Sequence, residues 1–130
     1  APPAFWKIAM RPGKPLLAGR VGDAVLLGLP GNPASAFVTA HLFLLPLLRR
    51  LAGAAAPLPD VAQAALATDL PGGGPRRDYL RAVVANGRIT PLTAQDSGLT
   101  SVLASANALL IREIGAPLQP AGTMAPYIAL

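Results

Sequence analysis

Several polar turns carry the residue types that could bind an anion. Arg11 and Lys14 lie in the first, where two prolines and a glycine enforce a turn. The second, residues 30–35 (PGNPAS), leads into a long apolar segment, so Asn32 suits the N-cap of a helix and Ser35 its first turn. Free backbone N–H groups and the helix dipole attract anions at such a start. We therefore expect an oxyanion site here if the strands before both turns run parallel in one sheet. Otherwise Asn32 only caps the helix and Lys14 is solvated.

Two later segments could add contacts to the same anion. Residues 72–77 (GGGPRR) are typical of a flexible loop that delivers arginines, and guanidinium donors match the oxygens of an oxyanion two at a time. The glycines are not a Walker motif, because no Gly-Lys-Ser/Thr follows them. Residues 95–98 (QDSG) form a polar start to a short helix. Each segment also has an ordinary interpretation, as solvated loop arginines or as a helix cap.

Composition excludes several other kinds of site. The chain has no cysteine, which rules out disulfides, thiolate catalysis and cysteine-ligated zinc. Its one histidine, His41, lies among leucines and fits a hydrogen-bonded core residue better than a ligand or a base. The carboxylates show no paired spacing for general acid–base catalysis. The net charge of +5 is scattered among few aromatics, so a small anionic substrate explains it better than nucleic acid does.

The first 52 residues have the pattern of an α/β domain. Residues 5–10 and 24–29 predict short strands, the second an apolar run of the buried parallel-sheet type. Residues 33–52 predict a helix, with Arg49 and Arg50 in its last turn, where cations complement the helix dipole.

The predicted helix is apolar nearly all round and must therefore be buried on several sides. A membrane span is the alternative, but the uncharged stretch 34–48 is shorter than the roughly 20 residues required. Pro46 would also remove a hydrogen bond to Leu42 and kink the helix. Since two strands cannot cover such a helix, we expect residues 1–52 to be the tail of an α/β domain whose beginning lies outside this chain.

The rest of the chain predicts a small β-barrel. Residues 53–59 form a linker rich in alanine and proline, and residues 60–130 follow as a second domain. Asn86-Gly87 is a strong hairpin signal. The predicted strands cover residues 61–68, 77–85, 88–93, 109–113 and 124–130, with a short helix over residues 97–106. The longest strand alternates, with Leu80, Ala82 and Val84 on one face and Arg77, Tyr79 and Arg81 on the other.

Two motifs resemble those of the MoeA/gephyrin family of molybdenum-inserting enzymes. The turn Arg11-Pro12-Gly13-Lys14-Pro15 is similar to the family's Lys-Pro-Gly-Lys-Pro, and residues 28–36 (GLPGNPASA) are similar to its Gly-Leu-Pro-Gly-Asn-Pro-Val-Ser. The order and separation of this pair also agree with the family. Residues 76–81 (RRDYLR) and the polar positions of residues 95–107 agree as well, so the resemblance covers essentially the whole chain.

The resemblance implies a fold and an activity. Family members fold as a three-layer α/β domain of the MogA type followed by a C-terminal β-barrel. They insert molybdenum from molybdate into adenylylated molybdopterin and release AMP with the help of a divalent cation, Mg²⁺. The molybdate and nucleotide pocket lies between the two domains. Carried over by motif, it would be lined by Arg11, Lys14, Pro15, Gly31, Asn32, Ser35, Arg76 and Ser97. Arg11 keeps the charge of the family's lysine but changes the donor geometry.

The resemblance also implies which functional residues this chain lacks and which partners the intact enzyme has. The family's acidic residues for metal and nucleotide precede the first strand seen here, so we expect no metal ligand, no catalytic residue and no turnover by the chain alone. The intact enzyme is expected to be a cytoplasmic homodimer with no membrane or nucleic-acid partner, and contact with the molybdopterin adenylyltransferase is a further expectation. The alternative is a non-catalytic binding or scaffold module of the gephyrin type. That alternative would not require Lys14, Ser35, Arg76 and Ser97 to face one pocket.

Overall fold

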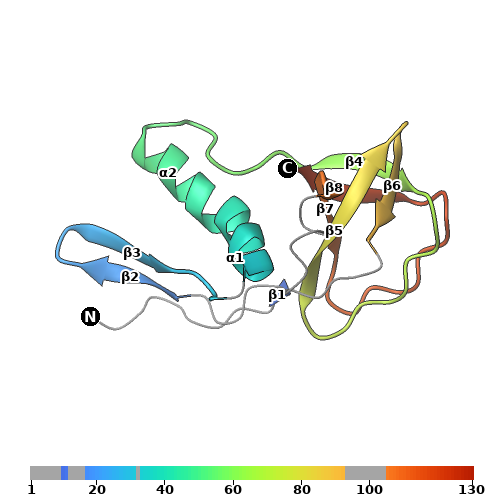
Figure 1. Cartoon of the computed structure of the whole chain (residues 1–130), viewed down its shortest axis with the longest axis horizontal. Coiled ribbons are helices and arrows are strands. Elements are labelled where there is room, and N and C mark those ends of the chain that lie inside the picture. Colours follow the sequence, from blue (N-terminus) through green and yellow to red (C-terminus); the bar gives the residue numbers. More distant parts are fainter. Residues whose placement is uncertain (1–9, 12–16, 32, 93–104) are drawn as a thin grey trace.

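The computed structural model of the 130-residue chain describes residues 10–11, 17–31, 33–92 and 105–130. A hairpin and a helix precede a β-barrel in the chain, and the helix lies between the hairpin and the barrel (Figure 1). The first part contains β1 (Met10–Arg11), β2 (Leu17–Val21), β3 (Ala24–Gly28) and a helix in three sections, α1 (Pro33–Thr39), η1 (Ala40–Leu44) and α2 (Leu45–Leu51). The second part contains β4 (Ala62–Leu66), β5 (Arg77–Ala85), β6 (Arg88–Pro91), β7 (Ala108–Arg112) and β8 (Met124–Ala129).

The hairpin corrects one sequence prediction. A strand over residues 24–29 is confirmed as β3, but it pairs antiparallel with β2, which the sequence analysis did not predict. Gly22 supplies the positive φ of 61° in the turn between them. Val25 and Leu26 are 41% and 45% exposed, so β3 is not the buried parallel strand that its apolar run suggested. The expectation that the strands before the two polar turns run parallel in one sheet is also wrong, because β1 belongs to the barrel sheet and β3 to the hairpin. An apolar run identifies a strand, but it does not identify the strand's partner.

The helix begins and ends where the sequence predicts, and Pro46 disturbs it as expected. The α-helical pattern changes to a π-helix over Ala40–Leu44, in which the N–H of Leu45 donates to the carbonyl of Ala40. Pro46 has no N–H, and its ring would meet the carbonyl of Leu42 in a regular α-helix. A wider turn just before the proline avoids that conflict, because it shifts the carbonyls relative to the ring.

Much of the helix surface is uncovered in this chain, in line with the expectation that two strands cannot cover it. Val38 and Thr39 are fully buried, whereas Leu48 and Leu51 are 51% and 65% exposed. Among the described residues, Ala34–Leu51 is the one helix long and apolar enough to cross a membrane by length and composition. We expected the uncharged stretch to be too short, but the helix reaches this length by including the two arginines at its end. Core helices of soluble proteins meet the same criterion.

The predicted barrel is confirmed. Its five strands close in the order β5-β6-β4-β8-β7, with β7 pairing back to β5. Asn86 and Gly87 take positive φ values of 54° and 75° and join β5 to β6 in the predicted hairpin. The barrel core consists of Ala64, Leu66, Leu70, Leu80, Ala82, Ile89, Ala108, Leu110 and Ala125. The helix expected over residues 97–106 lies outside the described residues apart from its last two positions.

Two contacts join the first part of the chain to the barrel. Val38 of α1 packs with Leu109 and Ile111 of β7 and Ile128 of β8, so the helix covers the outer face of these two strands. The short strand β1 pairs in parallel with the start of β5. Both contacts place the end of β1 beside the barrel, where Arg11 lies.

Candidate functional site

A buried carboxylate ties three strands together at this edge of the barrel. One oxygen of Asp78 on β5 lies 3.1 Å from Nε of Arg11 on β1. Its other oxygen accepts a hydrogen bond from Nε of Arg112 on β7 at 2.9 Å and forms an ion pair with Nη2 of the same arginine at 2.8 Å. The side chain of Asp78 is only 5% exposed, against 50% for Arg11 and 13% for Arg112. A charge this deeply buried requires paired partners, and the two guanidinium groups provide them.

The strand register explains how these three residues meet. Arg11 lies directly opposite Asp78 in the parallel β1–β5 ladder, and Arg112 lies directly opposite it in the antiparallel β5–β7 ladder. Side chains directly opposite each other in neighbouring strands are within reach, and opposite charges in such pairs attract. The backbone pairing of β5 with both neighbours therefore brings two arginines to one carboxylate.

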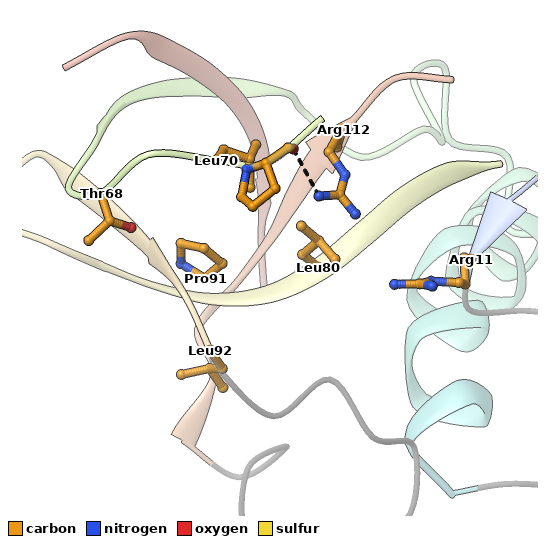
Figure 2. A pocket seen from close by; sticks show the side chains of 8 residues that line it. Arg11, Thr68, Leu70, Leu80, Pro91, Leu92 and Arg112 are labelled. Atoms are coloured by element: carbon orange, nitrogen blue, oxygen red, sulfur yellow. Dashed lines mark hydrogen bonds between the residues drawn. The ribbon is translucent and has the colours of Figure 1, made fainter. Parts of the chain in front are cut away.

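An open cleft of about 370 Å³ lies beside this cluster (Figure 2). Among the described residues its lining is mostly apolar, with two arginines as the charged groups: Arg11, Thr68, Leu70, Pro71, Leu80, Pro91, Leu92 and Arg112. Arg112 is further held by a hydrogen bond from Nη1 to the carbonyl of Pro71, 3.1 Å away. An anionic group could bind at the arginine side of this cleft, while an apolar body would rest on the prolines and leucines.

The glycine-rich loop before β5 is held in place, which corrects the expectation of a flexible loop. The N–H of Gly73 donates to the carbonyl of Ala116 at 2.8 Å, and the N–H of Gly115 donates to the carbonyl of Gly74 at 2.9 Å. A Cβ on Gly73 would lie 2.6 Å from the carbonyl oxygen of Glu113. The glycine is required here because two backbones approach closely, and this approach fixes the point where β5 and its arginines begin.

The structure places four of the eight predicted site residues. Arg11 lines the cleft, and Arg76 is half-buried in the loop directly before β5. Ser35 is buried in the first turn of α1, where its carbonyl accepts a hydrogen bond from Oγ1 of Thr39 at 2.8 Å. Gly31 is exposed at the bend before α1. The other four, Lys14, Pro15, Asn32 and Ser97, lie outside the described residues, so convergence of all eight on one ligand stays a prediction.

Comparison with known proteins assigns the chain to a family. Residues 63–130 match the family model of the MoeA C-terminal region (domain IV), and residues 1–50 match that of a probable molybdopterin binding domain. The chain belongs to the MoeA family. The predicted family resemblance is thereby confirmed, and with it a membership among proteins of molybdenum cofactor biosynthesis.

Several relatives of known name match parts of this MoeA-family chain. It is 34% identical over 111 residues to a molybdopterin molybdenumtransferase of Bacillus subtilis, a match over 82% of this chain and 26% of that protein. It is 51% identical over 49 residues to the enzyme of the same name from Haemophilus influenzae, a match over 38% of this chain and 12% of that protein. This chain therefore spans about a quarter of the length of the Bacillus subtilis relative.

Solved structures confirm the fold. A crystal structure of a molybdopterin biosynthesis MoeA protein from Pyrococcus horikoshii superposes with a TM-score of 0.84 at 23% sequence identity. The match covers 98% of this chain and 32% of that one. An α/β portion followed by a small β-barrel is thus the fold of this part of a MoeA protein, as the sequence predicts.

Sequence reasoning missed Asp78 and Arg112, although the strand pattern of this MoeA-family chain contained a signal for both. Asp78 lies on the same face of β5 as Leu80 and Ala82, which belong to the core. Arg112 likewise follows Ala108 and Leu110 on the inner face of β7. A single charged residue on an otherwise apolar face predicts a buried ion pair or a site, because an unpaired charge there would be costly.

The one histidine of the chain allows a direct test of the helix environment. His41 is partly buried and its ring packs against that of Phe37, with ring centroids 4.7 Å apart and the rings tilted by 52°. Burial lowers the pKa of His41 below its usual 6.5, and the nearby Arg49 lowers it further. In the unfolded chain the imidazole takes up a proton near pH 6.5, so protonation favours unfolding as the pH falls through that value. Above that pH the imidazole is neutral in both states and contributes no pH dependence.

We therefore expect His41 to titrate below pH 6.5 in the folded protein, and the free energy of unfolding to fall on acidification more steeply than in His41→Gln. NMR measures the first quantity without assignment, because only one imidazole is present. Urea unfolding of both proteins at about pH 7.5 and about pH 5.5 measures the second. A titration midpoint at or above 6.5 would contradict the burial argument.

Proposed function

We propose that this chain forms part of the substrate-binding surface of a molybdopterin molybdenumtransferase. Such an enzyme inserts molybdenum from molybdate into adenylylated molybdopterin and releases AMP. The names of the relatives and the two family models support this proposal. The whole reaction requires a longer protein, since the Bacillus subtilis relative is matched over only 26% of its length.

The observation that carries the proposal is the pairing of β1 with β5. Met10 lies opposite Arg77 and Arg11 opposite Asp78, so β1 runs beside the first residues of β5, which Arg76 directly precedes. The sequence predicted separate anion-binding turns in these two places. The pairing of β1 with β5 favours a single site, because it brings Arg11 near Arg76 in the fold and one tetrahedral oxyanion needs donors from several directions.

Four of the proposed residues have side chains that would hold an oxyanion directly. The guanidinium groups of Arg11 and Arg76 would donate in pairs to its oxygens, and Lys14 would act as a compact positive charge. Ser35 would donate from the start of α1. The remaining members of the proposed site are Pro15, Gly31, Asn32 and Ser97.

The finer features of the intact enzyme belong to the same proposal. We infer a cytoplasmic homodimer that contacts the molybdopterin adenylyltransferase and uses Mg²⁺. In the part of the chain that the structure describes, no three side chains of His, Asp or Glu group together as metal ligands. From the family resemblance we infer that the magnesium ligands and the catalytic residues of the intact enzyme lie outside this chain, and we expect no turnover from it alone.

A molybdate titration by calorimetry at low ionic strength tests the proposal. We expect the parent chain to bind molybdate, with sulfate as a competitor, because both are tetrahedral dianions. Lys14→Ala and Arg76→Ala should each weaken binding by about tenfold or more, the size of one charge-assisted hydrogen bond. Arg88→Ala is the matched control, since this exposed arginine lies in the β5–β6 hairpin and outside the proposed site.

The outcomes separate specific from general charge effects. Equal weakening by Arg88→Ala and Arg76→Ala would show that molybdate responds only to net charge, and the proposed site would be wrong. No binding by the parent chain would also count against the site as proposed for this chain. In that case the family assignment would stand on its own observations.

A further inference from the structure

We propose that Asp78 is a positioning residue for this oxyanion site: its carboxylate holds the guanidinium of Arg11 in a fixed direction at the cleft. The inference rests on the proposed function, because it assigns Arg11 to the binding of the anion. Asp78 itself is not a ligand of the anion, since a carboxylate repels one.

The division of hydrogen bonds in the cluster supports this role. Arg112 uses Nε and Nη2 for Asp78 and Nη1 for the carbonyl of Pro71, so three of its nitrogens are committed to the protein. It is also only 13% exposed. Arg112 therefore fixes the carboxylate of Asp78 and has little freedom to turn toward a ligand.

Arg11 is held in a different way. Among the residues that the structure describes, its ion pair is with Asp78 alone and uses Nε, at 3.1 Å. This contact engages Nε and leaves Nη1 and Nη2 as the further donors of the guanidinium. The side chain is 50% exposed and lines the cleft. Its exposed end is thus the part of the cluster that can meet an anion.

Fixing Arg11 in advance favours binding. A half-exposed arginine samples many rotamers, and ordering it when a ligand arrives costs free energy. The ion pair with Asp78 removes part of that cost before binding. The charge of the cluster remains favourable, because two guanidinium groups and one carboxylate leave a net positive charge beside the cleft.

The direction in which Asp78→Asn changes the affinity for molybdate distinguishes a positioning role of Asp78 from a simple effect of its charge. Asp78→Asn removes a negative charge near the site, so long-range electrostatics alone predicts tighter binding of molybdate. Positioning predicts weaker binding, because Arg11 loses its support. We expect Asp78→Asn to weaken molybdate binding about fivefold to tenfold, measured by calorimetry at a temperature where circular dichroism shows the variant folded.

A double-mutant cycle with Arg11→Ala tests whether Asp78 acts through Arg11. In the Arg11→Ala background, Asp78→Asn should leave the affinity unchanged or raise it. A loss of affinity of the same size in both backgrounds, or tighter binding in the parent background, overturns the proposal. Asp78→Glu is the second variant: it keeps the charge but moves the carboxylate by one methylene, and it should weaken binding less than Asp78→Asn.

A measurement on the free protein tests this inference separately from the proposed function. In the free protein, the ¹⁵N heteronuclear NOE of the Arg11 Nε–H should show an ordered group, and Asp78→Asn should abolish that order. Asp60→Asn, which changes an exposed aspartate, should not. If the parent chain binds no molybdate but the NOE behaves as expected, the binding function fails while the positioning of Arg11 stands. If the Arg11 signal is mobile in the parent, the inference is wrong whatever the titration gives.

Discussion

Replacing Asp78 by alanine should lower the free energy of unfolding by about 3 kcal/mol or more. The substitution leaves the guanidinium of Arg112, which is 13% exposed, without its carboxylate partner, and it opens space at the start of β5. Breaking a buried ion pair by removing one partner is costly, because the remaining charge stays buried and unpaired. Arg11 contributes less to the loss, since its half-exposed side chain can return to water.

Urea unfolding followed by circular dichroism measures this difference in stability. Asp60→Ala is the matched control, because Asp60 is an exposed aspartate before β4. We expect the control to change the free energy of unfolding by less than about 0.5 kcal/mol. A change of similar size in both variants would mean that the cluster around Asp78 contributes little to the fold.

Replacing Gly73 by alanine should cost about 2 kcal/mol of stability. The new Cβ would lie 2.6 Å from the backbone oxygen of Glu113, so one of the two backbones must move. That movement would strain the hydrogen bond from the N–H of Gly73 to the carbonyl of Ala116. The same unfolding experiment measures the effect.

The neighbouring glycine provides a close control for Gly73. A Cβ on Gly74 would meet no atom within 4 Å, and Gly74 is not among the described residues with a positive φ. Gly74→Ala should therefore be neutral, or stabilising by a few tenths of a kcal/mol through the unfolded chain. If Gly74→Ala costs as much as Gly73→Ala, the close approach to Glu113 is not the reason for the glycines.

Local sequence signals predicted most of the barrel. The Asn86-Gly87 turn and the alternation of Leu80, Ala82 and Val84 depend only on neighbouring residues, and both were confirmed. The helix ends were also predictable, because capping and breaking residues act within one turn. Pro46 predicted where the helix is irregular, and the structure shows that the irregular segment is a π-helix.

The sequence predictions failed where the structure depends on contacts between residues far apart in the sequence. The sequence around β3 cannot say that β2 is its partner, and the short β1 gives no sign that it pairs with β5. The cluster around Asp78 depends on two such pairings, so it became visible only when the register was known. The site prediction therefore contained Arg11 but neither Asp78 nor Arg112, and four of its residues lie outside the described part of the chain.

The short strand β1 also has a consequence for the solubility of the barrel. Along one edge of β5, β6 covers only residues 82–85, and β1 covers residues 77 and 78 at the other end. If β1 detached, the start of β5 would present unpaired N–H and C=O groups, on which a strand from another chain could add. Met10 and Arg11, which approach from outside the barrel, thus protect this edge of β5 from pairing with another chain. Their loss would favour aggregation before it unfolded the barrel.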